Sequence, residues 1–179
     1  MQPKTIKIAF NNDHFLDSRK IIWTFSNKKA VKTYTIFTIW AILLLGIDFL
    51  NKSSKTSIEA GVIYGYVFYL LLSWFGLLER RVKFLKKGKL WAKRFEKESR
   101  ECTFTLLEHE LEYQDKEKLY KLNWSLFNPY IIFKDTILLI AKDTRVVMFT
   151  MSKSEVDDEN YSEICDILKD KIGFDKVMK

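Results

Sequence analysis

The sequence is poor in the residues that enzymatic sites most often use. Its 179 residues include six glycines, two histidines and two cysteines. Six glycines leave little for loops that cradle phosphates or dinucleotides, and neither such a motif nor G-x-S-x-G is present. His14 and His109 are not adjacent to the cysteines, and no C-x-x-C or H-x-x-x-H spacing exists for a metal. We therefore expect no enzyme, and no catalytic residue, metal or cofactor.

Two long apolar runs dominate the first half of the chain. The first spans residues 33–50 and has one charge, Asp48, whereas the second spans residues 60–78 and has none. A helix of about 18 residues rises roughly 27 Å, close to the hydrocarbon thickness of a bilayer, about 30 Å. The nine residues 51–59 separate the runs. The sequence therefore predicts a transmembrane hairpin, and we favour Asp48 as an interfacial carboxylate over an ion or proton site within the membrane.

Positive charge gathers at the ends of these runs. The net charge is +5 in residues 1–78, +7 in residues 79–100 and −5 in residues 101–179, whereas the turn has only Lys52 and Lys55. Because short cytoplasmic loops are rich in Lys and Arg, both termini are expected in the cytoplasm. Cys102 and Cys165 would then stay reduced. Since membrane topology already explains the basic residues, we expect no nucleic-acid partner.

Residues 79–100 are predicted to form a basic amphipathic helix that continues the second span. Its apolar stripe contains Phe84, Trp91 and Phe95, either at the lipid interface or packed on the soluble domain. The basic residues nearest the span are expected to contact anionic lipid headgroups: Arg80, Arg81, Lys83, Lys86 and Lys87. Three others lie farther out and are candidates for pairing with the acidic domain: Lys93, Arg94 and Lys97.

Gly61 and Gly65 form a G-x-x-x-G spacing in the second span. Small residues at this spacing let two helices approach closely. They are interpreted either as a homodimer face or, as we favour, as the surface that packs against the first span of the same hairpin.

In the rest of the chain, the spacing of apolar residues changes between the period of two that is typical of strands and the period of 3.6 that is typical of helices. Residues 5–10 alternate as a strand, and a helix capped by Asn12 or Asp13 follows, with a break or bend expected at Ser26-Asn27. Six short antiparallel strands are predicted at residues 102–106, 111–114, 120–126, 130–133, 137–141 and 146–150. An amphipathic helix follows, with a capping box of Ser154 and Asp157 and a stop at Gly173.

These elements predict an α+β membrane protein. A two-helix transmembrane hairpin (33–78) is inserted into a small antiparallel β domain, similar to a pleckstrin-homology (PH) domain and closed by the C-terminal helix. Residues 1–32 supply the first strand and a helix, residues 79–100 the connector, and residues 101–179 the remaining domain. Trp124 is expected in the core, on one strand face with Tyr120, Leu122 and Leu126.

The layout resembles the YcxB-like family of bacterial membrane proteins. The resemblance is best at Asn123-Trp124-Ser125, followed by the apolar strands Thr136–Ile140 and Val146–Thr150. It implies a location in the bacterial inner membrane and no established activity. We expect a non-enzymatic binding module at that membrane, with anionic lipid and an unknown protein as partners and a homodimer as a further option. The alternative is a small accessory subunit of a larger membrane complex or transporter.

Overall fold

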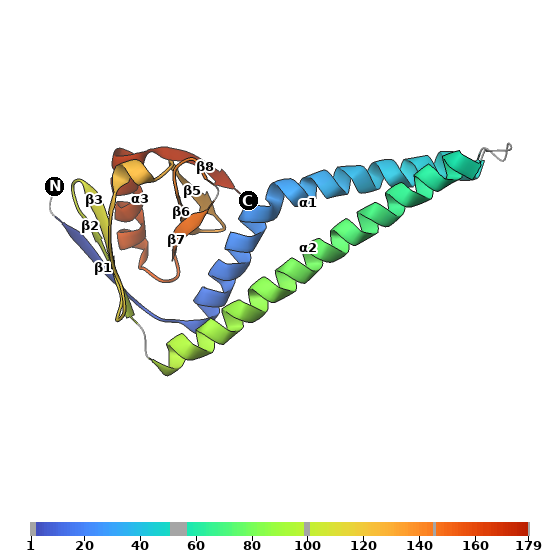
Figure 1. Cartoon of the computed structure of the whole chain (residues 1–179). Coiled ribbons are helices and arrows are strands. Elements are labelled where there is room, and N and C mark those ends of the chain that lie inside the picture. The colour runs from blue at the N-terminus through green and yellow to red at the C-terminus, as the bar shows by residue number, and fades with distance from the viewer. Residues whose placement is uncertain (1–2, 51–56, 99–100, 145, 179) are drawn as a thin grey trace. The chain divides into compact units, whose positions relative to one another are not determined.

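The computed structural model describes residues 3–50, 57–98, 101–144 and 146–178. The chain is α+β and divides into two compact units. We call Trp23–Lys86 the hairpin unit, and Met1–Ile22 together with Lys87–Lys179 the β unit. The two long helices, α1 (Asn12–Leu50) and α2 (Ser57–Lys97), each contribute to both units (Figure 1).

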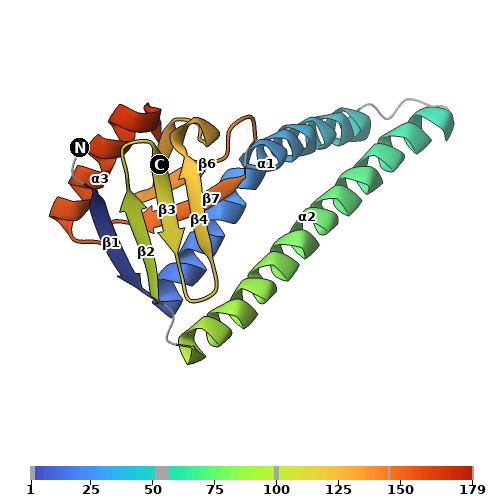
Figure 2. The same ribbon diagram turned by 60° about the vertical axis from the view of Figure 1, so that its left-hand side comes forward.

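The first sheet of the β unit joins the two ends of the sequence. Its strands are β1 (Lys4–Ala9), β2 (Glu101–Leu106), β3 (Glu110–Gln114) and β4 (Leu119–Asn123), in the antiparallel order β1-β2-β3-β4 (Figure 2). Ile6 lies opposite Phe104, and the side chains of β1 alternate between buried and exposed. The N-terminal strand expected over residues 5–10 is therefore present, and it pairs with the first strand after the helices.

The second sheet contains one strand that the sequence did not predict. Its order is β7-β6-β5-β8, formed by β5 (Tyr130–Phe133), β6 (Thr136–Ile140), β7 (Val147–Ser152) and β8 (Phe174–Met178). β8 follows the last helix and pairs parallel with β5. The β5–β6 turn places Lys134 and Asp135 at φ 48° and 57°, as tight hairpin turns require.

Helix α3 (Asp158–Ile172) lies between the two sheets (Figure 1). Ile164 and Leu168 are fully buried there, in one core cluster with residues of both sheets. Asp157 is the N-cap, because its Oδ1 accepts a hydrogen bond from the Asn160 amide at 2.8 Å. The capping box with Ser154 in the cap position is therefore wrong, whereas the stop at Gly173, at φ 75°, is confirmed.

Three other local predictions also need correction. The cap of α1 is Asn11, whose Oδ1 accepts hydrogen bonds from the amides of Asp13 and His14 at 2.9 and 3.1 Å. The break expected at Ser26-Asn27 is absent, since α1 continues through both residues. The third predicted strand ends at Asn123, and Trp124–Leu126 forms a 3₁₀ turn, η1.

Candidate membrane hairpin and ligand cleft

The hairpin unit exposes an unusual amount of apolar side chain. In the most apolar 18-residue window of each helix, only 6% of α1 and 11% of α2 is buried. Large side chains more than half exposed include Trp40, Ile42, Phe68 and Phe75. A core helix of a soluble protein would bury such residues, so both helices have the length and surface of candidate membrane spans.

Three polar side chains of the hairpin unit, those of Thr38, Ser73 and Trp74, hydrogen-bond within it. Trp74 Nε1 donates to Thr38 Oγ1 at 2.9 Å, and that hydroxyl donates to the Tyr34 carbonyl at 2.7 Å. Ser73 donates back to the Tyr69 carbonyl at 2.9 Å. Satisfied polar groups are what a hydrocarbon environment requires, whereas a substrate path needs polar groups turned toward the substrate. The side chain of Asp48 lies outside the described residues, as do Lys52 and Lys55.

The basic residues of α1 and α2 occupy the same level of the hairpin. The contact of Thr38 with Trp74 places residues near 30 of α1 beside residues near 80 of α2. The Arg81 guanidinium lies 5.2 Å from the centroid of the Trp23 ring, which fixes the pairing at the end of the unit. This level contains Lys28, Lys29 and Lys32 of α1, and Arg80, Arg81, Lys83 and Lys86 of α2. We call these seven residues the basic belt.

Gly61 and Gly65 do not pack against α1. A Cβ atom added at either glycine would meet no heavy atom within 4 Å. The favoured interpretation, packing within the same hairpin, is therefore wrong. The homodimer face stays a prediction.

The apolar stripe of the connector divides between two environments. The Phe95 ring packs against Phe10 and Phe15 of the β unit, with centroid distances of 5.7 and 5.6 Å. The Trp91 ring is 41% exposed, and both Arg19 and Lys87 lie 5.2 Å from its centroid. Phe84 belongs to the hairpin unit and is partly buried. For Phe95, packing on the domain accounts for the apolar position.

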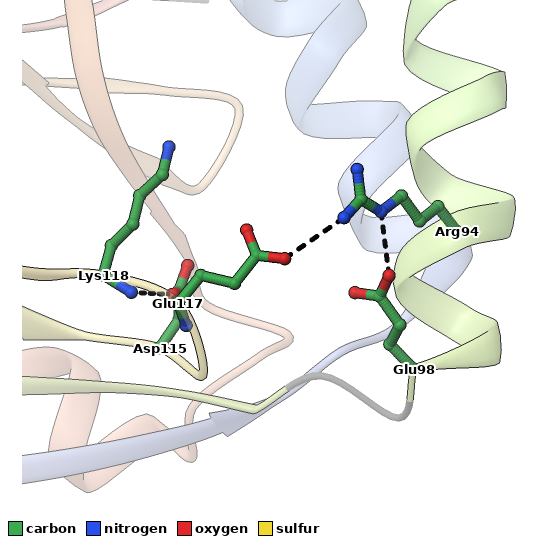
Figure 3. Close-up of polar contacts among 5 residues, drawn as sticks. All are labelled: Arg94, Glu98, Asp115, Glu117 and Lys118. Carbon is green, nitrogen blue, oxygen red and sulfur yellow. Dashed lines mark hydrogen bonds and ion pairs between the residues drawn. The ribbon is translucent and has the colours of Figure 1, made fainter.

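An ion-pair network anchors the end of α2 to the first sheet (Figure 3). Arg94 Nη2 lies 3.2 Å from Glu117 in the β3–β4 turn, and Arg94 Nε lies 2.8 Å from Glu98. Lys116 of the same turn donates to the Glu98 carbonyl. The expected pairing of the outer basic residues with the domain is therefore seen for Arg94. The exposed pair contributes at most about 1 kcal/mol, so it orients the helix end and adds little stability.

The β unit contains a cleft of about 450 Å³. Two clusters of aromatic side chains line it: Phe10, Phe15 and Phe95, from the residue after β1, from α1 and from α2, and Phe104, Tyr113, Tyr120 and Phe149 from the two sheets. Arg19, Trp91, Cys102 and Glu155 also line it. The sequence analysis missed this cleft, because its walls come from segments about 80 to 140 residues apart.

Burial changes the acid–base properties of the groups that line the cleft. Desolvation raises the pKa of the Cys102 thiol to about 12, with smaller contributions from Glu155 and Asp115. It also raises the pKa of the Glu155 carboxyl, although a hydrogen bond from Ser152 N and the nearby His14 act in the opposite direction. Burial lowers the pKa of Arg19. A thiol held protonated is a poor nucleophile, so Cys102 is poorly suited to nucleophilic attack.

A second cavity of about 620 Å³ is polar and contains charges paired with one another. Lys20 lies 2.8 Å from Asp17, and Lys153 lies 3.3 Å from Asp158. His14 Nδ1 lies 3.0 Å from Ser154 Oγ, but no described carboxylate hydrogen-bonds the other ring nitrogen to complete a triad. Among the described residues no group of three His, Cys, Asp or Glu side chains has the geometry to hold a metal ion.

Comparison with known protein families, with characterised proteins and with solved structures found no match. The function therefore has to be argued from the hairpin, the basic belt and the cleft. The resemblance to the YcxB-like family stays a prediction.

Proposed function

We propose that this chain is a non-enzymatic integral membrane protein of the bacterial inner membrane and that its β unit is a binding module on the cytoplasmic side. One observation carries the proposal: the apolar windows of α1 and α2 are only 6% and 11% buried. The hairpin turns that surface outward, and polar side chains such as Thr38, Ser73 and Trp74 are hydrogen-bonded within it, as a lipid solvent requires. The Lys/Arg asymmetry supports the orientation, with both termini in the cytoplasm.

A PH-like arrangement of the β unit is part of this proposal. Three features support it. The first sheet is a four-stranded antiparallel meander, strands β7, β6 and β5 of the second sheet are antiparallel, and the C-terminal helix lies in the core. The concave aromatic cleft favours a binding module over the alternative, an accessory subunit that acts through its hairpin, since Thr38, Ser73 and Trp74 of the hairpin are hydrogen-bonded within it.

The orientation is tested by thiol labelling of intact cells. Cysteine at Ser53, between the two spans in sequence, is expected to react with a membrane-impermeant maleimide. The matched variant Ser125→Cys, exposed in η1 of the β unit, is expected to react only after the cells are permeabilised. The native thiols add little background, because a pKa near 12 in place of 9.0 leaves Cys102 roughly 1,000-fold less thiolate. Labelling of Ser125→Cys in intact cells, with Ser53→Cys silent, would reverse the orientation.

The basic belt is expected to enrich anionic lipid around the protein. Headgroup attraction amounts to roughly 1 kcal/mol per basic residue near a membrane surface and weakens with salt. The chain extracted from mixed-lipid membranes should therefore copurify anionic over zwitterionic lipid, as measured by mass spectrometry. Changing Arg80, Arg81, Lys83 and Lys86 to Gln should abolish most of this enrichment. Four Lys→Gln changes on the β unit, at positions 116, 121, 142 and 153, remove the same charge and should leave it intact. Equal enrichment in all three proteins would reject the electrostatic role.

A further inference from the structure

The cleft in the β unit is larger and more aromatic than a packing defect. Protein interiors are close-packed, and voids larger than a water molecule are few. A cleft of about 450 Å³ with eight aromatic side chains in its walls lies in the size range of small-ligand sites, roughly 300–1,000 Å³. The two aromatic clusters line it from different elements, one from α1, α2 and the residue that follows β1, and the other from the sheets. Such walls suit a hydrocarbon chain.

The guanidinium of Arg19 places a positive charge in the wall of the cleft. Arg19 lines the cleft and stacks on Trp91 with 5.2 Å between the guanidinium carbon and the ring centroid. Gly88 of α2 permits this position, because a Cβ there would lie 3.3 Å from Arg19 Nε. Any larger residue would push the guanidinium away. Burial lowers the pKa of Arg19, so its charge is partly desolvated and gains from an anion beside it.

Two of the three acidic groups that line the cleft, Asp115 and Glu155, accept hydrogen bonds within the protein, and the third, Glu101, is exposed to solvent at the start of β2. Asp115 Oδ1 accepts hydrogen bonds from the amides of Glu117 and Lys118, both at 2.8 Å. Glu155 accepts one from the Ser152 amide at 2.8 Å, and burial raises its pKa, which reduces its negative charge. Lys118, the second cation of the lining, is exposed to solvent. Arg19 is therefore the group best placed to receive an anionic head.

We propose that the cleft binds a long-chain carboxylate, with its head on Arg19 and its hydrocarbon chain between the two aromatic clusters. Arginine pairs with carboxylates through two parallel hydrogen bonds, and the aromatic walls remove the chain from water. The inference rests on the proposed function for one point, the bilayer as the source of the ligand. It makes the β unit a sensor of free fatty acid released from membrane lipid.

The test uses the full chain in nanodiscs of zwitterionic lipid. The probe is dodecanoate with a diazirine at the end of its chain, compared with the corresponding dodecanol probe, and adducts are mapped by mass spectrometry. Label on the hairpin unit measures partition into the disc and serves as the internal reference. The carboxylate is expected to label peptides containing Phe15, Phe95 or Phe149 roughly tenfold more than the alcohol, since a charged hydrogen bond discriminates by about this factor or more.

Variants of Arg19 and Ala9 test separately the binding of the carboxylate head and of the hydrocarbon chain. Arg19→Gln should bring the carboxylate to the level of the alcohol, whereas Lys20→Gln, the adjacent residue whose side chain lines the other cavity, should keep the preference. Ala9→Trp fills the cleft and should remove label from both probes. Hydrogen exchange of β2 and β6 checks that each variant is folded. Label confined to the hairpin unit, or an undiminished preference in Arg19→Gln, would overturn the inference. Because nanodiscs expose both faces, these outcomes do not depend on the orientation measured at Ser53.

Discussion

Replacing Ile6 and Ile8 together by alanine is expected to unfold the β unit. Both side chains of β1 are buried, at 6% and 7% exposure, in the core cluster with Phe104 and Leu106 of β2. A buried Ile→Ala change costs about 2–5 kcal/mol, so the pair removes about 4–10 kcal/mol. That is comparable with the whole stability of a typical domain, about 5–15 kcal/mol. The two sites share one face of a strand, so their effects need not add.

Hydrogen exchange of the full chain in nanodiscs measures this effect without unfolding the hairpin. Amides of β2 and β3 should exchange at least about 1,000-fold faster in the double variant, since every 1.4 kcal/mol is a factor of about ten. The matched control, Thr5→Ala with Lys7→Ala, changes the exposed face of the same strand and should alter exchange by less than about tenfold. Unchanged protection in the Ile6/Ile8 variant would mean that β1 does not belong to this core.

β1 also determines which residues belong to the β unit. It pairs with β2 along the register from Lys4–Leu106 to Ala9–Glu101, although the two strands are more than 90 residues apart in sequence. A fragment of residues 101–179 lacks this strand, and it also lacks the parts of α1 and α2 that belong to the β unit. The sequence predicted that residues 101–179 form the domain together with a strand from residues 1–32, whereas the contacts define the compact unit as Met1–Ile22 with Lys87–Lys179.

The alternation of apolar and polar side chains was enough to predict most of the sheet. Strands with one buried face, such as β1 and β3, repeat with period two, and α3 repeats with the period of a helix. Strand β8 was missed because its sequence, Phe-Asp-Lys-Val-Met, is short and mixed, and its parallel partner β5 is about 40 residues away. A local pattern contains no information about such a partner.

Parts of the candidate site could likewise be predicted from the sequence, and other parts could not. The hairpin and its basic residues follow from composition, because a run of apolar residues and flanking charges are local properties of the sequence. The cleft does not, since Phe10, Phe95 and Phe149 line it together only when the residue after β1, helix α2 and strand β7 are brought together by the fold. The position of Arg19 was equally hidden: its side chain lies close to Gly88 of α2, but nothing near Gly88 in the sequence points to α1.

Trp124→Ala is expected to destabilise the β unit by about 3–5 kcal/mol, the usual cost of removing a buried aromatic side chain. The ring is 6% exposed and lies 6.1 Å from Phe127, centroid to centroid. Its Nε1 donates to the Leu107 carbonyl at 3.0 Å, so Trp124 also ties the β2–β3 turn to η1. Trp124→Phe keeps most of the apolar volume and loses this hydrogen bond, and it should cost about 1–2 kcal/mol.

Leu126 provides the comparison that distinguishes the 3₁₀ turn from the strand expected over residues 120–126. On a strand, Trp124 and Leu126 would share a face and both would be buried. In η1 the two residues diverge, and Leu126 is 49% exposed. Leu126→Ala should therefore cost less than about 1 kcal/mol, as for most surface positions. Hydrogen exchange of β5 and β6 in the full chain measures both variants. Equal losses at the two positions would favour the continuous strand, whereas a large loss at Trp124 alone requires the chain to turn at Asn123.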